Sequence, residues 1–238
     1  MYLDLARTTG RRILELAVGS GRIAVALAAA GYDVTGVDND PAMLARARAA
    51  WKGNGRGEEN GTAGGGSLTL IDDDLMTLDL ATRFDLVILA LNSLLLLDGR
   101  AAQQRALEVM RAHLAPAGRV VIDVWLPTTD DLELYDGRPI LDWIRTDPQT
   151  SQRVAKTNVA HYDATTNSAT LTTRFDAQSD DQPPRTTTRV DTVTFVGATE
   201  LLALADEAGL SVERVIGDYA GTPWSEASER VVLIAGIG

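Results

Sequence analysis

Short apolar segments alternate with segments of helical periodicity between residues 12 and 125. The apolar segments have the length of strands and are 12–17, 33–38, 67–72, 84–90 and 119–125. The segments of helical period are 22–30, 41–51 and 100–113. Several of the strands are apolar on both faces, as strands covered by helices on each side must be. The pattern therefore predicts repeated βα units around a parallel sheet.

A different pattern begins after Trp125, where Thr-rich segments alternate polar and apolar residues with a period of two. Three such segments, 153–162, 169–175 and 186–196, predict strands separated by turn-rich stretches. We therefore expect an antiparallel three-stranded insertion over residues 126–197.

The C-terminal part returns to a helix over 199–208, which Gly209 ends, and then to strands over 211–219 and 229–237. The two strands predict that a β-hairpin closes the sheet. The fold class is thus α/β, and the expected core consists of two stretches of chain, 1–125 and 198–238.

The charge and composition narrow the class of partner. A formal net charge of -11 argues against nucleic acid, because that affinity depends on Lys and Arg neutralising phosphates. The apolar runs are far shorter than the ~20 residues that span a bilayer, and no secretory signal is visible. The chain contains no cysteine, so it has no disulfide or thiolate. We expect a small-molecule partner, no nucleic acid, no membrane and a cytoplasmic location, while a homo-oligomer stays open.

One motif carries most of the chemical information. Residues 13–22, ILELAVGSGR, run from a predicted strand through a glycine-rich turn into a helix. Such glycines let the backbone pass close to a ligand, and the helix start supplies N–H donors. Asp38 ends the next strand, where a carboxylate can accept hydrogen bonds from the two hydroxyls of a ribose. The motif predicts a nucleotide-type site.

The turn alone fits two classes of ligand. Residues 19–24, GSGRIA, match the dinucleotide fingerprint GxGxxA, so an NAD-dependent oxidoreductase is the main alternative. Glu15 lies just before the turn, where its carboxylate would repel a pyrophosphate but could pair with the α-amino group of S-adenosylmethionine. The charge of Glu15 therefore favours the second ligand.

Two further features point the same way. A run of acids, residues 72–74, ends the third strand, where a carboxylate can accept a proton from the adenine amino group. The closing hairpin is unusual for a nicotinamide-binding domain, and no Tyr is followed four residues later by Lys, as in short-chain dehydrogenases. These features favour an S-adenosylmethionine-dependent methyltransferase. An NAD-dependent oxidoreductase and a non-catalytic, methyltransferase-like binding protein stay as alternatives.

The ordered set of motifs resembles the class I methyltransferases. The stretches that carry the resemblance are 14–22, 34–48 (VTGVDNDPAMLARAR), 70–75, 84–95 and 113–125. The chain is most similar to the small-molecule branch with an antiparallel lid after the fifth strand, such as glycine and aminosugar N-methyltransferases. The resemblance implies a Rossmann-like seven-stranded sheet, S-adenosylmethionine as the cofactor without a metal, and a substrate lid over 126–197.

The resemblance also implies roles for individual residues. It assigns the cofactor to four segments: Glu15, Ala17, Gly19 and Gly21 for the methionyl part; Asp38, Asn39 and Met43 for the ribose; Asp74 and Leu75 for the adenine; and Leu91 for the sulfonium. Two features depart from the family: Ala17 replaces the usual first glycine of the turn, and only about a dozen residues precede the first strand.

The acceptor side offers weaker candidates. Asn92 and His161 are candidates for catalytic contacts, and three aromatic residues are candidates for a wall around the acceptor: Trp125, Tyr219 and Trp224. Methyl transfer from a sulfonium is an in-line displacement in which the protein mainly positions the reactants, so no dedicated base is required. On family analogy, we expect nitrogen as the methyl acceptor.

Overall fold

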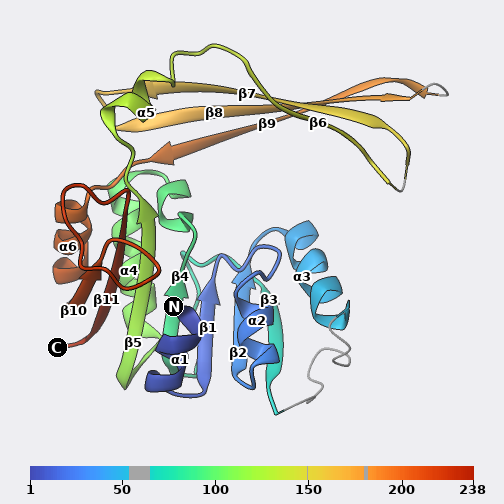
Figure 1. The fold of residues 1–238 in the computed structure, drawn as a ribbon. Coiled ribbons are helices and arrows are strands. Elements are labelled where there is room, and N and C mark those ends of the chain that lie inside the picture. Colours follow the sequence, from blue (N-terminus) through green and yellow to red (C-terminus); the bar gives the residue numbers. More distant parts are fainter. Residues whose placement is uncertain (54–64, 149, 180–181) are drawn as a thin grey trace. The chain divides into compact units, whose positions relative to one another are not determined.

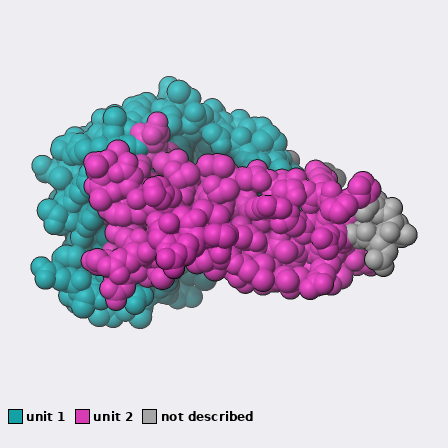
Figure 2. All heavy atoms as spheres, turned by 90° about the horizontal axis from the view of Figure 1, so that it is seen from above, with its two compact units in different colours: residues 1–94, 99–126, 197–238 teal, residues 95–98, 127–196 magenta. Residues whose placement is uncertain are grey.

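The computed structural model describes residues 1–53, 65–148, 150–179 and 182–238 (Figure 1). These residues form two compact units, which Figure 2 distinguishes by colour. Unit 1 comprises three stretches, Met1–Leu94, Gly99–Leu126 and Gly197–Gly238. Unit 2 comprises Leu95–Asp98 and Pro127–Val196.

Unit 1 is built on a seven-stranded sheet in the order β10-β11-β5-β4-β1-β2-β3 (Figure 1). Its strands are β1 (Arg12–Leu16), β2 (Asp33–Asp38), β3 (Ser67–Asp72), β4 (Phe84–Leu89), β5 (Leu114–Trp125), β10 (Leu210–Ile216) and β11 (Arg230–Ile237). The first five pair in parallel, whereas β11 is antiparallel to both β5 and β10. The predicted parallel sheet with a terminal β-hairpin is confirmed.

Helices lie on both faces of this sheet, with α1 and α2 in front and α4 behind in Figure 1. They are α1 (Tyr2–Thr9), α2 (Ala24–Ala29), α3 (Pro41–Gly53), α4 (Gly99–Ala112) and α6 (Ala198–Glu207), with a 3-10 turn, η1, at Ser93–Leu96. The pattern did not predict α1, which packs Tyr2, Leu3 and Leu5 against the core.

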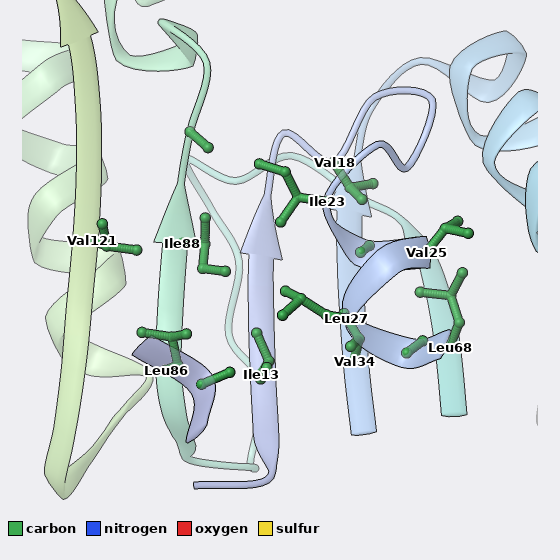
Figure 3. Close-up of a cluster of buried hydrophobic side chains, with 14 of the residues drawn as sticks. Ile13, Val18, Ile23, Val25, Leu27, Val34, Leu68, Leu86, Ile88 and Val121 are labelled. Carbon is green, nitrogen blue, oxygen red and sulfur yellow. The ribbon is translucent and has the colours of Figure 1, made fainter. Parts of the chain in front are cut away.

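The core explains why the strand positions could be predicted. Ile13, Val34 and Leu68 on neighbouring strands lie with Leu27 of α2 in one buried cluster (Figure 3). Burying each of these side chains contributes about 1.5 to 3 kcal/mol. The sheet therefore holds the carboxyl ends of its parallel strands in fixed register.

Unit 2 contains α5 (Thr129–Glu133) and a four-stranded antiparallel sheet in the order β6-β7-β8-β9. The strands are β6 (Ile140–Thr146), β7 (Arg153–Asp163), β8 (Ser168–Ser179) and β9 (Gln182–Thr194). The prediction of three strands was wrong by one. β6 is an edge strand whose residues are almost all exposed, so it lacks the alternation of a half-buried strand.

The stretch 176–184, predicted as turn-rich, also belongs largely to strands β8 and β9. Pro183 and Pro184 are tolerated there because β9 is the other edge of the sheet and can omit ladder N–H donors. The α/β class with an antiparallel insertion is confirmed. None of the described helices combines the length and apolar character needed to cross a bilayer.

Candidate functional site

The turn that leaves β1 runs through left-handed backbone conformations. Ala17, Gly19 and Gly21 have φ angles of 53°, 55° and 79°, so the turn uses two glycines and one strained alanine. The backbone N–H of Gly19 donates to Oδ2 of Asp38 at 2.7 Å. This bond joins the turn after β1 to the end of β2.

A small cavity of about 50 Å³ lies between this turn and the ends of β2 and β3. It is lined by Ala17, Val37, Asp38, Asn39, Asp73 and Leu75. Four of the residues expected from the sequence therefore lie together, namely Ala17, Asp38, Asn39 and Leu75.

The acidic residues at the end of β3 have different roles. The backbone N–H of Asp73 donates to the carbonyl of Asp38 at 3.2 Å, and Asp73 lines the cavity. Oδ1 of Asp74 accepts the N–H of Met76 at 2.9 Å, so this carboxylate stabilises its own turn. Asp74 is exposed. Another residue expected at the site, Met43 on α3, is half-buried. Asp73 is thus a cavity residue that the family resemblance did not assign to the cofactor.

Glu15 is a buried carboxylate at the end of β1. Its side chain is 3% exposed, and Oε2 has no hydrogen-bond partner among the described residues. Burial raises the pKa of Glu15 to about 8, against the smaller opposing effects of the Ala24 backbone and the Arg22 charge. In its ionised form a carboxyl group buried this deeply needs a cationic partner, and an α-ammonium group would satisfy it.

The segment leaving β4 is also strained. Leu91 and Asn92 are consecutive left-handed residues, with φ angles of 56° and 69°. Oδ1 of Asn92 accepts the backbone N–H of Trp125 at 2.7 Å, so Asn92 ties the exit of β4 to the end of β5. This bond gives Asn92 a structural role at the strand exit, beside the catalytic contact for which the sequence made it a candidate.

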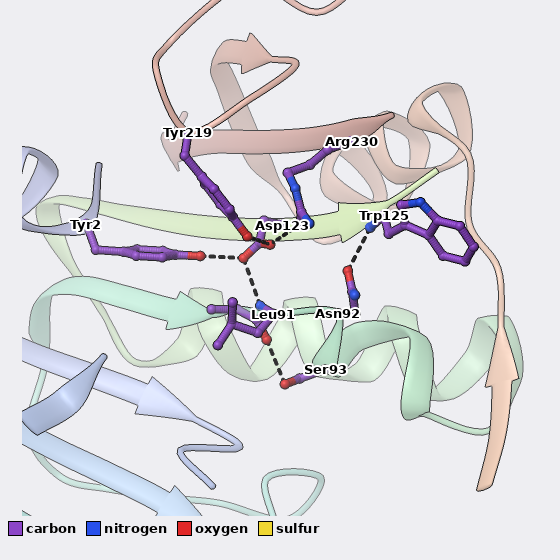
Figure 4. A network of polar contacts seen from close by, with 9 residues as sticks. Tyr2, Leu91, Asn92, Ser93, Asp123, Trp125, Tyr219 and Arg230 are labelled. Atoms are coloured by element: carbon purple, nitrogen blue, oxygen red, sulfur yellow. Dashed lines mark hydrogen bonds and ion pairs between the residues drawn. The ribbon is translucent and has the colours of Figure 1, made fainter. Parts of the chain in front are cut away.

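Asp123 of β5 is the residue that the sequence interpretation missed. It is fully buried, and its carboxylate accepts hydrogen bonds from Tyr2, Leu91, Tyr219 and Arg230 (Figure 4). A signal was present, because Asp123 interrupts the apolar run 120–124 just as Glu15 interrupts β1.

The remaining candidates are scattered. Tyr219 and Trp224 lie on the connection between β10 and β11, where Tyr219 is 41% exposed and Trp224 Nε1 is buried without a partner among the described residues. His161 is exposed on β7, within unit 2, in an isolated bridge with Asp136. The described chain contains no group of three potential metal ligands.

The set of groups at the carboxyl end of the sheet fits S-adenosylmethionine. The unpartnered Glu15 oxygen suits an ammonium group, and the glycine-rich turn leaves room for close approach. Each oxygen of Asp38 accepts one backbone N–H, which leaves it lone-pair capacity that a ribose hydroxyl could use.

Comparison with known sequences gives two matches. The family model described as "Methyltransferase domain" matches residues 13–118. The cypemycin N-terminal methyltransferase of a Streptomyces species is 25% identical over 233 residues, covering 94% of this chain and 82% of that protein.

Solved structures share the whole fold. The CcbJ methyltransferase from Streptomyces caelestis superimposes with a TM-score of 0.77 at 22% identity, covering 100% of this chain and 93% of that one. The sugar N-methyltransferase KedS8 from Streptoalloteichus sp ATCC 53650 has a TM-score of 0.73 at 23% identity, covering 100% and 84%.

The matched family model and the similar proteins are methyltransferases, which favours that class over the NAD-dependent oxidoreductase that the glycine-rich turn left open. Residues 13–118 thus match a methyltransferase domain, and the described chain has the fold of the methyltransferases CcbJ and KedS8.

Proposed function

We propose that this enzyme transfers the methyl group of S-adenosylmethionine to a nitrogen atom of a small-molecule acceptor by direct in-line displacement. The observation that carries the choice of nitrogen is the state of the two phenols beside the site. The hydroxyl groups of Tyr2 and Tyr219 both donate hydrogen bonds to Asp123.

Burial and the neighbouring Asp123 carboxylate raise the pKa of each phenol well above its usual value. Both tyrosines therefore stay protonated and cannot act as general bases at neutral pH. A general base matters more for a hydroxyl acceptor, whereas an amine that arrives neutral already carries a nucleophilic lone pair. This difference supports nitrogen.

The names of two relatives support the same choice. One is an N-terminal methyltransferase for cypemycin and one is a sugar N-methyltransferase. One name specifies an N-terminus and the other a sugar nitrogen, so methylation at nitrogen is what the two names share.

In this proposal Glu15 holds the ammonium group of the cofactor, and Asp38 and Asn39 hold the ribose. Leu75 and the neighbouring acids, Asp73 and Asp74, bound the adenine, and Leu91 lies toward the sulfonium. The bound cofactor supplies an electrophilic methyl group on sulfur. The residues contribute orientation and exclusion of water, which together can supply several kcal/mol of the barrier reduction.

We assign acceptor binding to unit 2, the expected lid. Unit 2 has its own cavity of about 420 Å³, within the usual range for small-molecule sites. It is lined by Leu134, Tyr135, Ile140, Lys156, Asn158, Val159, Ala160, Leu171, Thr172 and Thr173. The mainly apolar lining with an amide and an ammonium group suits an acceptor with an apolar body and a few polar substituents.

The test is release of S-adenosylhomocysteine with matched pairs of acceptors. Each pair contains an amine and its hydroxyl analogue: an amino sugar and the parent sugar, an N-terminal alanine peptide and its lactoyl counterpart. We expect turnover with amines only, and a kcat/KM that rises with pH through the pKa of the amine. Mass spectrometry of the product should find the added methyl on nitrogen. Turnover of a hydroxyl analogue without its amine would contradict the proposal.

Asn158→Leu tests the cavity in unit 2. With an amine that turns over, this variant should raise KM and leave the affinity for S-adenosylhomocysteine unchanged. Thr157→Leu, on the opposite face of β7, is the matched control. Equal effects of the two substitutions would contradict a role for the cavity.

A further inference from the structure

Four separate chain segments meet on the carboxylate of Asp123 (Figure 4). Oδ1 accepts the hydroxyl of Tyr2 in α1 and, at 2.9 Å, the backbone N–H of Leu91 after β4. Oδ2 accepts the hydroxyl of Tyr219 at 2.7 Å and Nη1 of Arg230 at 2.6 Å. The guanidinium of Arg230 also lies 4.6 Å from the ring centroid of Tyr219.

These contacts use the full hydrogen-bonding capacity of the carboxylate. An ionised Asp offers about four lone-pair positions, and Asp123 receives four donors. Arg230 balances its charge, as a fully buried carboxylate requires. Asp123 therefore has no free lone pair with which to bind a substrate or remove a proton, and it acts through its partners.

The partner with a functional consequence is the turn at Leu91 and Asn92. Two successive non-glycine residues in the left-handed region are strained, and such strain persists only where surrounding contacts fix it. Asp123 supplies two of those contacts, because its carboxylate accepts the N–H of Leu91 and its backbone carbonyl accepts the N–H of Asn92 at 3.3 Å.

We propose that Asp123 is a positioning residue of the cofactor site, which fixes the Leu91–Asn92 turn and the Tyr219 phenol at the end that would face the sulfonium. The inference rests on the proposed cofactor site, in which Leu91 lies toward the sulfonium. Binding of the nucleoside end of the cofactor depends on other residues, above all on Asp38. Loss of Asp123 should therefore weaken ligands that reach the sulfur end and spare ligands that stop at the nucleoside.

The test compares two ligands, S-adenosylhomocysteine and adenosine, by calorimetric titration of wild-type protein and Asp123→Asn. The amide replaces one acceptor oxygen with a donor that faces other donors. We expect the affinity for S-adenosylhomocysteine to fall roughly tenfold or more and the affinity for adenosine to change less than about twofold.

Asp85→Asn is the matched control. Asp85 lies at the amino end of β4, where it also accepts a backbone N–H, that of Arg12 at 2.9 Å, and pairs with the Arg12 side chain at 3.6 Å. This variant should bind both ligands as the wild type does.

The outcomes separate the inference from the function on which it rests. Equal behaviour of Asp123→Asn and Asp85→Asn, or an equal loss of both ligands, would overturn the positioning role. If Asp123→Asn does not fold, Tyr219→Phe decides, because it removes a single hydroxyl from a residue that is 41% exposed. Tyr219→Phe should lower the affinity for S-adenosylhomocysteine several-fold and leave the affinity for adenosine unchanged. A wild type that binds no S-adenosylhomocysteine would overturn the proposed cofactor site, and the inference with it.

Discussion

The backbone N–H of Gly19 donates to Oδ2 of Asp38 at 2.7 Å, so two loops from neighbouring strands share one carboxylate. Oδ1 of Asp38 accepts the N–H of Asp40 at 2.9 Å, which starts the turn toward α3. The carboxylate is therefore oriented by the backbone before a ligand arrives. Such preorganisation lowers the cost of ordering the site on binding.

Asp38→Ala should weaken S-adenosylhomocysteine binding by about 1 to 3 kcal/mol, because ribose hydroxyls lose their acceptor. Calorimetric titration measures the change. Asp33→Ala is the control, since Asp33 begins the same strand and bonds Arg11 and Ser67 at the opposite end. Unchanged affinity in Asp38→Ala would count against the site.

The pH dependence of stability should reveal Glu15. Its pKa is raised to about 8 in the folded protein, compared with about 4.3 in an unfolded chain. A raised folded-state pKa gives stability that is complete below about pH 4 and is lost as the pH rises through about 8. Relative to Glu15→Gln, we expect the wild type without ligand to lose roughly 2 to 5 kcal/mol of unfolding free energy between pH 5 and pH 8.5.

Urea unfolding at several pH values measures this difference. Glu226→Gln, at an exposed position, is the control and should follow the wild-type profile. Parallel profiles for the wild type and Glu15→Gln would show that Glu15 is ionised in the free protein.

Cofactor binding should release a proton from Glu15. Most molecules carry a protonated Glu15 at pH 7, and pairing with an ammonium group requires the carboxylate. We expect S-adenosylhomocysteine binding to release most of a proton from this residue at pH 7 and much less at pH 9. The number of protons released is obtained from the binding enthalpies measured in phosphate and in Tris buffers. The control, Asp38→Asn, should bind S-adenosylhomocysteine more weakly and still release the proton. A binding enthalpy of the wild type that does not depend on the buffer at pH 7 would contradict the pairing of Glu15 with the ammonium group.

The parallel sheet and the cofactor side could be predicted because their signals are local. Apolar runs mark β1, β2 and β4, the glycine-rich turn directly follows β1, and Asp38 ends β2. Parallel strands in a sheet then bring these loops to one edge without further information.

The Asp123 cluster could not be predicted in the same way. Tyr2, Leu91, Tyr219 and Arg230 are all far from Asp123 in the sequence, and only the tertiary fold joins them to it. The sequence does mark Asp123 as an acid in an apolar strand, but it does not reveal the partners. β6 escaped prediction for another reason, since an exposed edge strand leaves no hydrophobic period.

The two glycines of the turn should respond differently to alanine. A Cβ on Gly19 would meet no described atom within 4 Å, whereas a Cβ on Gly21 would lie 3.0 Å from both Ala47 Cβ and Val25 Cγ2. Both positions have positive φ, and a left-handed alanine costs about 1 to 2 kcal/mol, a strain that the turn already carries at Ala17. Gly21→Ala should therefore destabilise the protein more than Gly19→Ala does.

Ligand binding should follow the opposite order. The Cβ of Gly19→Ala projects into open space at the turn, where we place the methionyl part of the cofactor. This variant should therefore lose more S-adenosylhomocysteine affinity than Gly21→Ala does, although it loses less stability. Urea unfolding and calorimetric titration of both variants measure the two effects. A Gly19→Ala variant that binds like the wild type would move the cofactor away from this turn, and a Gly21→Ala variant of wild-type stability would contradict the packing against α3.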